Sequence, residues 1–424
     1  MILPKYSEFC GRVKTLSGAS ALEAIPGELK KMNSKKALII TDKGVESAGL
    51  IKIVKEAISK KGSKLTVGAI YDETPPDSDY KVVNSVASIY RNKNCDSIIA
   101  VGGGSVLDTA KGVNILVSLG GDNVLAYSGA GAVKQRLKPL VAVPTTAGTG
   151  SEMTLVAVIA DHDRHIKMTF VSYFLLPDIA VLDPRMTKTL PASITAFTGM
   201  DAMTHAIEAY FCLGKNPMSD TTAFKAIQLV SKNILNAVKN PGDMESRLAM
   251  ANAAALAGIA FSNSMVGLVH NLGHATGAVC HVPHGVCMSI YLPYGMEYNL
   301  HKVGDLIGEL LYPLAGPEIF AKTPKKQRPR ATIDYVRGLN EELKKATGGR
   351  HATALKDILD REGKQMVPRD AIPVIAKNAM GDGAKTYNPE EQSFDDNIMV
   401  IEAAWEGKPL DLKKIKKGPK NQKF

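Results

Sequence analysis

The chain has 424 residues, of which 45% are hydrophobic and 22% charged, so it is long enough for two or three globular domains and is neither disordered nor fibrous. The formal net charge of +10 comes from 52 basic and 42 acidic residues, and two basic clusters begin at Lys322 and Lys413. Because no aromatic interleaving or nucleic-acid module accompanies these clusters, we interpret them as solvated segments and expect no nucleic-acid partner.

Cysteine usage and hydropathy indicate the compartment. The five cysteines are an odd number and widely scattered, and the residues around Tyr6 do not form the apolar core of a signal peptide. No apolar run approaches the roughly 20 residues that a membrane-spanning helix needs. We therefore expect a cytoplasmic protein with reduced thiols and no membrane partner.

The first part of the chain alternates apolar, β-branched runs with amphipathic segments. Runs at 37–41, 65–71 and 96–101 predict buried strands. Between them, apolar residues recur at helical spacing from Leu50 to Ile58 and again after Asp77. This alternation predicts a parallel sheet covered by helices on both faces.

Later strands complete the predicted sheet, and the pattern then changes. We expect strands near 139–144 and 179–184, with a hairpin between them around the turn at 161–164. Beyond Pro184 almost no strand pattern remains. The chain is therefore predicted to hold an α/β domain over 1–185 and an all-α domain over 186–424. Residues from Tyr312 to about 331 are predicted to form an exposed basic insertion.

A glycine-rich turn follows the strand at 96–101. Gly102, Gly103, Gly104 and Ser105 lie between a strand and a helix, where bare backbone N–H groups and the positive helix end can hold a phosphate. The turn matches neither the G-x-G-x-x-G pattern nor a P-loop, and a plain tight turn is an equally good interpretation.

Two further features favour a dinucleotide at this sheet. Asp42 ends the strand at 37–41, where its carboxylate could accept hydrogen bonds from ribose hydroxyls and repel a 2′-phosphate, although it could equally cap the next helix. Thr145 and Thr146 open a run of hydroxyls and glycines after the strand at 139–144, suited to a pyrophosphate or ribose. Lys167 is either a surface lysine or a cation directed at the cofactor.

Histidines gather in the second half of the chain. Residues 267–287 contain four of the nine histidines, and Asp201 and His205 lie four residues apart in an earlier apolar segment. Both segments should form buried helices, in which unsatisfied ionisable groups are costly. A divalent metal would satisfy them. The i, i+4 spacing nominates His270 and His274 as the remaining ligands, with His281 and His284 as alternatives.

The chemistry of such a site is specific. Three neutral imidazoles and one carboxylate around a divalent ion leave a net charge near +1, which lowers the pKa of a bound hydroxyl and polarises a carbonyl. Cys280 and Cys287 fit no zinc motif around Pro283, so we discount them as ligands. A metal site together with a dinucleotide site indicates hydride transfer at an oxygen-bearing carbon.

Four motifs in this order resemble the iron-containing (group III) alcohol dehydrogenase family. They are GGGSVLDTAK, AVPTTAGTGSE, GMDAMTHAIEAY and GLVHNLGHATGAVCHVPHGVC. The resemblance covers roughly residues 37–300 and returns in AMGDGAKTYNPEE near the C-terminus. It implies a dehydroquinate synthase-like architecture, with an α/β dinucleotide-binding domain before an all-helical metal-binding domain.

The resemblance also assigns residues. By position, the metal ligands are Asp201, His205, His270 and His284, whereas His274 faces the nicotinamide and assists proton movement. His284 would then lie beside Pro283 at the start of the next helix. The implied cofactor contacts are Gly102, Gly103, Gly104, Ser105, Val106, Asp108, Thr145, Thr146, Thr154 and Lys167, with Asp42 favouring NAD. Val106 stands where the family usually has proline, a change that the turn should tolerate.

The implied activity is that of an NAD-dependent alcohol dehydrogenase containing Fe²⁺, which interconverts a small alcohol and its aldehyde or ketone. Zn²⁺ could replace iron, because ligand type alone does not choose between them. A zinc-dependent glycerol-type dehydrogenase is therefore one alternative. A dehydroquinate synthase-type lyase is another, although the helical segments show no cluster of basic residues for a substrate phosphate. The family commonly forms homodimers or larger oligomers, and we expect the same here.

Overall fold

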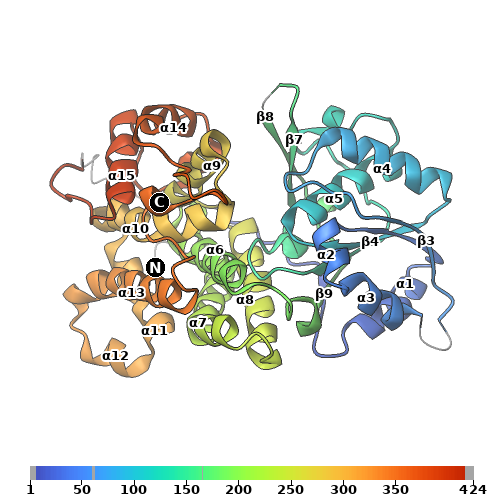
Figure 1. Ribbon diagram of the computed structural model, residues 1–424, viewed down its shortest axis with the longest axis horizontal. Helices are drawn as coiled ribbons and strands as arrows, with labels where there is room; N and C mark the ends of the chain where they lie inside the picture. Colours follow the sequence, from blue (N-terminus) through green and yellow to red (C-terminus); the bar gives the residue numbers. More distant parts are fainter. Residues whose placement is uncertain (1–5, 60–62, 165, 416–424) are drawn as a thin grey trace. The chain divides into compact units, whose positions relative to one another are not determined.

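The computed structural model describes residues 6–59, 63–164 and 166–415 (Figure 1). Parts of three predictions lie outside these residues: the start of the N-terminal segment, His165 in the predicted hairpin, and most of the C-terminal basic cluster. Within the described part of the chain, no helix combines the length and the apolar character needed to cross a membrane.

The chain divides into two compact units. The sheet unit comprises Cys10–Leu190 and Gly242–Gly258, and the helical unit comprises Pro191–Pro241, the residues from Ile259 onward, and the described residues before Cys10. The domain limits at 185 and 186 were taken from the end of the strand pattern, and they stay a prediction.

A parallel sheet of six strands forms the centre of the sheet unit, in the order β1-β9-β6-β4-β2-β3. Its strands are β1 (Lys14–Ser17), β2 (Lys36–Ile40), β3 (Thr66–Tyr71), β4 (Ser97–Gly102), β6 (Leu140–Pro144) and β9 (Ile179–Leu182). The predicted parallel sheet is confirmed, but the sequence interpretation missed β1. This strand has only four residues and is mostly exposed at the sheet edge, so it carries no apolar run.

Helices cover both faces of this sheet, as predicted (Figure 1). On one face lie α4 (Tyr80–Asn92) and α5 (Gly104–Leu119); on the other lie α1 (Ile25–Lys31), α2 (Lys43–Ser47) and α3 (Leu50–Ile58). Along β2, Leu38 and Ile40 join the first core whereas Ile39 joins the second, and all three are fully buried. Central strands buried on both faces read as continuous apolar runs, which explains why they were recognisable in the sequence.

The strand order contains a switch point between β2 and β4. From β2 the chain moves outward to β3, and it then returns to β4 on the other side of β2. The segment after β2 leads to α2 on one face, while the segment after β4 leads to α5 on the opposite face. In open α/β sheets, ligands bind at the carboxyl ends of the strands beside such a switch point.

A second, smaller sheet accompanies the first. It has the order β5-β8-β7, and β7 (Val156–Asp161) and β8 (Ile166–Val171) pair in antiparallel fashion. The predicted hairpin is therefore confirmed for its described residues. The short strand β5 (Gly129–Ala130), which no pattern indicated, pairs with β8.

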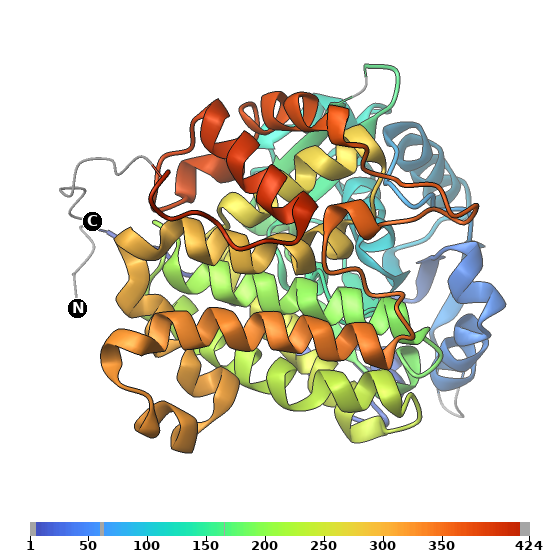
Figure 2. The same ribbon diagram turned by 60° about the vertical axis from the view of Figure 1, so that its left-hand side comes forward.

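The helical unit is built from long helices packed lengthwise, as Figure 2 shows for α6, α7, α10 and α13. Its helices include α6 (Ala192–Phe211), α7 (Pro217–Lys239), α9 (Leu268–Cys280), α10 (His284–Glu309), α11 (Leu311–Ala315), α12 (Pro317–Lys322), α13 (Arg328–Ala346), α14 (Ile372–Ala379) and α15 (Phe394–Glu406). The end of α8 (Met244–Ser262) also belongs to it. Among the described residues, only the isolated bridge Leu359–Gln365 shows β pairing after β9, so the prediction of a helical second half is confirmed.

The predicted exposed insertion after Tyr312 is partly wrong. Pro313 and Leu314 are buried in α11, because their apolar side chains pack where this helix meets α7 and α13. Residues 317–330 are mostly exposed, as predicted, but they are largely helical.

One histidine of the helical unit is buried away from the cluster predicted to bind metal. The His351 side chain stacks on Phe197 at 5.3 Å, and its Nε2 lies 3.0 Å from Asn340 Oδ1. Its buried Nδ1 has no hydrogen-bond partner among the described residues. Burial lowers the pKa of His351 to about 4, because a proton on Nδ1 would have no acceptor.

The variant His351→Gln should make the free energy of unfolding less dependent on pH at acidic pH. As the pH falls below about 6.5, the unfolded chain binds the proton first, so the wild-type protein loses stability until pH 4 is approached. Each pH unit in this window costs about 1.4 kcal/mol for one such group. Urea unfolding midpoints measured from pH 7 to 4.5 should therefore fall less steeply for His351→Gln. The exposed His281 provides the control, since His281→Asn should keep the wild-type slope; equal slopes in all three proteins would contradict the prediction.

Candidate metal centre

Helix α6 supplies three ionisable side chains from one of its faces. Asp201, His205 and Glu208 lie at positions i, i+4 and i+7, and their exposed fractions are only 2%, 5% and 0%. Residues 199–211 of α6 are buried throughout, because apart from these three the segment consists mainly of alanine, methionine and other apolar or small residues. Its polar groups must therefore find partners inside the protein.

Helices α9 and α10 bring two histidines to the same place. His270 lies in the first turn of α9, and His284 is the first residue of α10, next to Pro283, as the resemblance implied. The chain breaks between the helices at 281–283, so residues 267–287 form two helices. At Gly285 an added Cβ would lie 2.7 Å from the carbonyl oxygen of Phe197, so glycine permits α10 to begin directly against α6.

Four of the predicted ligands converge. One ligand atom each from Asp201, His205, His270 and His284 lies within 4.8 Å of the other three. Asp201 Oδ1 is 3.5 Å from His205 Nδ1 and 3.4 Å from His284 Nε2. Two ligands about 2.1 Å from a shared ion in tetrahedral geometry would be roughly 3.4 Å apart, so these spacings suit a divalent metal. The His274 ring lies 5.8 Å from that of His270, and His274 is not among the four residues.

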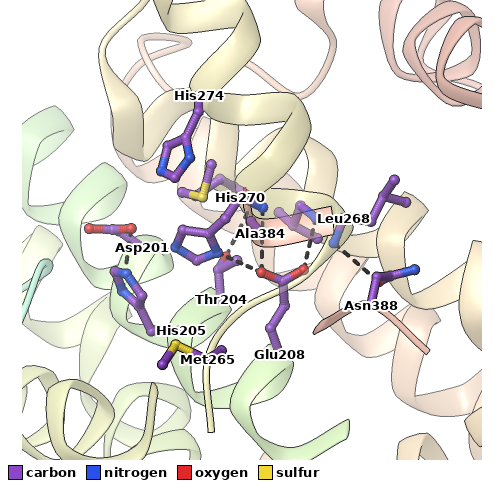
Figure 3. Close-up of polar contacts among 12 residues, drawn as sticks. Asp201, Thr204, His205, Glu208, Met265, Leu268, His270, His274, Ala384 and Asn388 are labelled. Carbon is purple, nitrogen blue, oxygen red and sulfur yellow. Dashed lines mark hydrogen bonds and ion pairs between the residues drawn. The ribbon is translucent and has the colours of Figure 1, made fainter. Parts of the chain in front are cut away.

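The bonding state of these atoms supports the same interpretation. Asp201 Oδ1, His205 Nδ1 and His270 Nε2 are buried and lack a hydrogen-bond partner within the described parts of the chain. An unsatisfied buried polar atom costs on the order of 1–3 kcal/mol. A cation at the point where the three atoms meet would satisfy all of them. Figure 3 shows these three side chains directed toward one another.

The protonation states also match those of metal ligands. Burial lowers the pKa of His205 to about 3, and burial, together with the neighbouring His284, lowers the pKa of His270 well below its usual value. Burial alone would raise the pKa of Asp201, but the imidazoles of His205 and His284 hold that pKa far below its usual value. The site therefore presents neutral imidazoles and an ionised carboxylate, which are the forms that bind a cation.

Glu208 fixes the orientation of His270. Its carboxylate accepts hydrogen bonds from the backbone N–H groups of Val269 at 2.8 Å and His270 at 3.4 Å, and it lies 2.5 Å from His270 Nδ1 (Figure 3). The residue thus caps α9 and leaves His270 Nε2 directed toward the other predicted ligands. Burial raises the pKa of Glu208 to about 7, although the backbone donors act in the opposite direction. The sequence interpretation missed Glu208, whose signal was its position three residues after His205.

Asp382 orients His274 in a similar way. Asp382 Oδ2 lies 2.9 Å from His274 Nδ1, and the other carboxylate oxygen accepts a hydrogen bond from the Ala384 N–H at 2.7 Å. The His274 ring stacks at 5.3 Å on that of His284, and its side chain is 44% exposed. Asp382 was not singled out in the sequence, although it lies in the C-terminal segment that carries the family resemblance.

An aromatic side chain covers one ligand. The Phe261 ring stacks on His205 with centroids 4.2 Å apart and planes at 19°. This contact restricts rotation of the imidazole and keeps water from that face of the ring.

The predicted cofactor residues all lie in the sheet unit, and several side chains already have partners within the protein. Asp42 caps α2 by accepting a hydrogen bond from the Val45 N–H at 2.9 Å, which was one of the two interpretations left open. The Ser105 hydroxyl donates to the Pro76 carbonyl. Lys167 is exposed and pairs with Asp77 at 2.8 Å. Their contacts with a cofactor remain predictions.

The two predicted phosphate-binding segments do lie together. The Thr145 N–H donates to the Gly102 carbonyl at 3.1 Å, and a Cβ added to Gly103 would be 3.5 Å from the Thr146 side chain. Gly102 also meets Val106 so closely that an added Cβ would be 2.5 Å from it. The turn therefore requires a residue without a side chain at Gly102.

Two other predicted cofactor residues form hydrogen bonds with residues of the sheet unit itself. Asp108 accepts hydrogen bonds from the Ser151 hydroxyl at 2.8 Å and from the Val158 N–H at 3.0 Å. The Thr154 hydroxyl is buried and accepts a hydrogen bond from Lys111 at 2.8 Å. The structure thus gives both residues a role in joining segments of the sheet unit, whereas their direct contact with a cofactor stays a prediction.

Comparison with known proteins covers nearly the whole chain. Residues 13–184 match the family model described as iron-containing alcohol dehydrogenase, and residues 195–405 match the C-terminal model of the same family. The NAD-dependent methanol dehydrogenase of Bacillus methanolicus is 33% identical over 91% of this chain and 97% of its own length. Alcohol dehydrogenase 4 of Saccharomyces cerevisiae is 33% identical over 92% and 96%.

A solved structure agrees with these matches. A 1,3-propanediol oxidoreductase superposes with a TM-score of 0.87 at 29% identity, over 94% of this chain and all of its own. Family models and relatives therefore cover both units that the structure describes. The chain belongs to the iron-containing alcohol dehydrogenase family, whose members use NAD and a divalent metal.

Proposed function

We propose that this chain interconverts a small alcohol and its aldehyde or ketone with NAD as the hydride acceptor or donor, and that Asp201, His205, His270 and His284 hold Fe²⁺. The observation that carries the proposal is the convergence of these four ligand atoms within 4.8 Å. Three of the atoms are buried and have no hydrogen-bond partner among the described residues, so a cation would satisfy them. Iron is the metal for which the family is described.

The ligands provide binding and orientation. A divalent ion held there would favour ionisation of an alcohol hydroxyl and polarise a carbonyl. Burial keeps His205 and His270 neutral at physiological pH, so their ring nitrogens have lone pairs to donate. Glu208 and Phe261 hold two of the rings in place, which reduces the entropy lost when a cation binds.

His274 is the residue that we propose for proton movement. Because Asp382 accepts the hydrogen bond from Nδ1, Nε2 of the neutral ring is left with a free lone pair. The side chain is 44% exposed, so a proton taken up at Nε2 can pass to water. Its stacking on His284 keeps it beside the ligand cluster.

For NAD we propose a site at the carboxyl ends of β2 and β4. The Gly102–Gly104 turn and the N-terminus of α5 would hold the pyrophosphate, with Thr145 and Thr146 beside it. Asp42, at the end of β2, would accept hydrogen bonds from the ribose. The switch point in the strand order supports this location.

We also propose a cytoplasmic location and a homodimer or larger assembly. The five cysteines are an odd number and widely scattered, as expected in a reducing compartment. Light scattering coupled to size-exclusion chromatography would measure the assembly state.

Removal of one ligand should abolish metal binding. The variant His270→Ala is expected to lose its bound metal and at least about 100-fold of kcat/KM with a short primary alcohol and NAD, because the remaining ligands hold a cation weakly. Elemental analysis of anaerobically purified protein measures the loss and separates iron from zinc. His281→Asn, at an exposed histidine of the same segment, should keep both metal and activity. Full activity in protein verified as metal-free would contradict the proposal.

Glu208 should matter for metal affinity even though it is not itself one of the ligands. Glu208→Gln is expected to lower metal affinity by roughly 10- to 100-fold, because the amide no longer fixes His270 with a carboxylate. Metal retention during titration with a chelator measures this effect. Glu297→Gln is the matched control: Glu297 is equally buried but bonds to Arg330 and Arg337, so its loss should lower stability and leave metal affinity unchanged. Equal metal retention in both variants would refute the role of Glu208.

Asp42 should determine the choice between NAD and NADP. Asp42→Ser keeps a side chain that can cap α2 but removes the negative charge near the ribose. We expect the ratio of kcat/KM for NADP to that for NAD to rise by about tenfold or more, since repulsion of the 2′-phosphate is relieved. Steady-state kinetics with both cofactors measure the ratio, and thermal unfolding checks that the cap is retained. An unchanged ratio would place the ribose elsewhere.

A further inference from the structure

A buried lysine of α5 has four oxygen partners in one segment of chain. Lys111 is only 1% exposed. Its Nζ lies 2.9 Å from the Ser151 hydroxyl, 2.8 Å from the Thr154 hydroxyl, 3.0 Å from the Thr154 carbonyl and 2.7 Å from the Val156 carbonyl. All four oxygens belong to residues 151–156, which begin where the predicted run of hydroxyls and glycines from Thr145 ends, at Ser151.

Burying Lys111 close to another ionisable side chain costs folding free energy. Burial lowers the pKa of Lys111 to about 8 and raises the pKa of the nearby Glu152, also buried, to about 7. Each ion removed from water costs several kcal/mol, and apolar residues of similar volume often stabilise a protein as well or better. A buried ionic network is therefore weak evidence for stability. The network does restrict the residues bonded to Lys111 to one geometry, because displacing them would leave the buried ammonium without hydrogen-bond partners.

The geometry fixed by Lys111 concerns both predicted cofactor segments. Asp108, one helical turn before Lys111, accepts hydrogen bonds from the Ser151 hydroxyl and the Val158 N–H. Asp108 and Lys111 thus form hydrogen bonds from one face of α5 to residues 151–158. The N-terminus of α5 is the Gly102–Gly104 turn. On the opposite side, Gly150 has a φ of +62°, and a Cβ added there would lie 2.5 Å from the Ala254 carbonyl, so glycine lets this end of the segment pack directly against the backbone of α8.

We propose that Lys111 is a positioning residue for NAD: it holds residues 151–156 against α5 and so sets the spacing between the Gly102–Gly104 turn and the threonines at 145–149. The inference rests on the proposed cofactor site. Lys111 itself does not reach the cofactor, because its ammonium is enclosed by protein oxygens. Its effect passes through Gly103 and Thr146 and through Gly104 and Thr149, whose close approaches depend on this spacing.

The test compares Lys111→Met with Asn114→Ala. Methionine keeps the length of the side chain and removes the charge. Asn114 is the matched control, since it is 2% exposed on the same helix but bonds to the Lys138 carbonyl, away from the cofactor segments. We expect Lys111→Met to weaken NADH binding, followed by fluorescence titration, by about tenfold or more, and to raise KM for NAD by a similar factor. KM for the alcohol and the metal content should stay unchanged. Asn114→Ala should lower thermal stability and leave NADH affinity as it is.

A second variant keeps the test decisive if Lys111→Met does not fold. Ser151→Ala removes only the hydroxyl between Asp108 and Lys111, and it should weaken NADH binding by a smaller factor in the same direction. The inference is overturned if NADH affinity is unchanged in the variants that fold, or if Asn114→Ala loses as much NADH affinity as they do. Failure of the wild-type protein itself to bind NADH would instead overturn the proposed function, so the two failures are distinguishable.

Discussion

The cost of burying ionisable side chains without partners is the constraint on which the helical unit depends. Asp201, His205 and His270 direct polar atoms into a region from which water is excluded, and within the described chain these atoms have no hydrogen-bond partner. In buried, mostly apolar segments such as these parts of α6 and α9, apolar residues would serve stability as well or better. A cation would account for their presence, because it would satisfy all three polar atoms at once.

Bringing these side chains together requires helices to approach closely at defined points. Gly285 lets α10 begin against the backbone of α6. Gly267 does the same for α9, since a Cβ there would lie 2.7 Å from Asn388 Oδ1 and 3.3 Å from Glu208 Oε1. The N–H groups of Leu268 and Val269 then bond to those two side chains (Figure 3). The same contacts that satisfy the start of α9 therefore set the direction of His270.

Periodicity and spacing predicted much of this molecule. The central strands were recognisable because both of their faces are buried, and Asp201, His205 and His270 were nominated because their spacing places them on helix faces. Spacing alone then chose His274 over His284, because it compares only residues four apart on one helix. His284 belongs to the next helix: α9 is capped at its C-terminus by His281, whose φ is +56°, and α10 begins at His284. No periodic pattern contains such a break, so it was the family resemblance that selected His284, the histidine found within the cluster.

The residues that sequence reasoning missed are those whose role depends on contacts between distant segments. Glu208 is 62 residues from His270, Asp382 is 108 residues from His274, and Lys111 is 40 or more from its partners. In the sequence each is an ordinary charged residue in or near a helix. Each forms a hydrogen bond with a group on a distant segment of the chain. The sequence does not show which group that is, so it gives no reason for a charged side chain at that position. The two units of this alcohol dehydrogenase thus use buried charge in the same way. In the helical unit a carboxylate orients the ring of His270, and in the sheet unit an ammonium bonds to backbone carbonyls. On our proposals, each of these charged residues acts on the chemistry through another group and does not itself contact the reacting atoms.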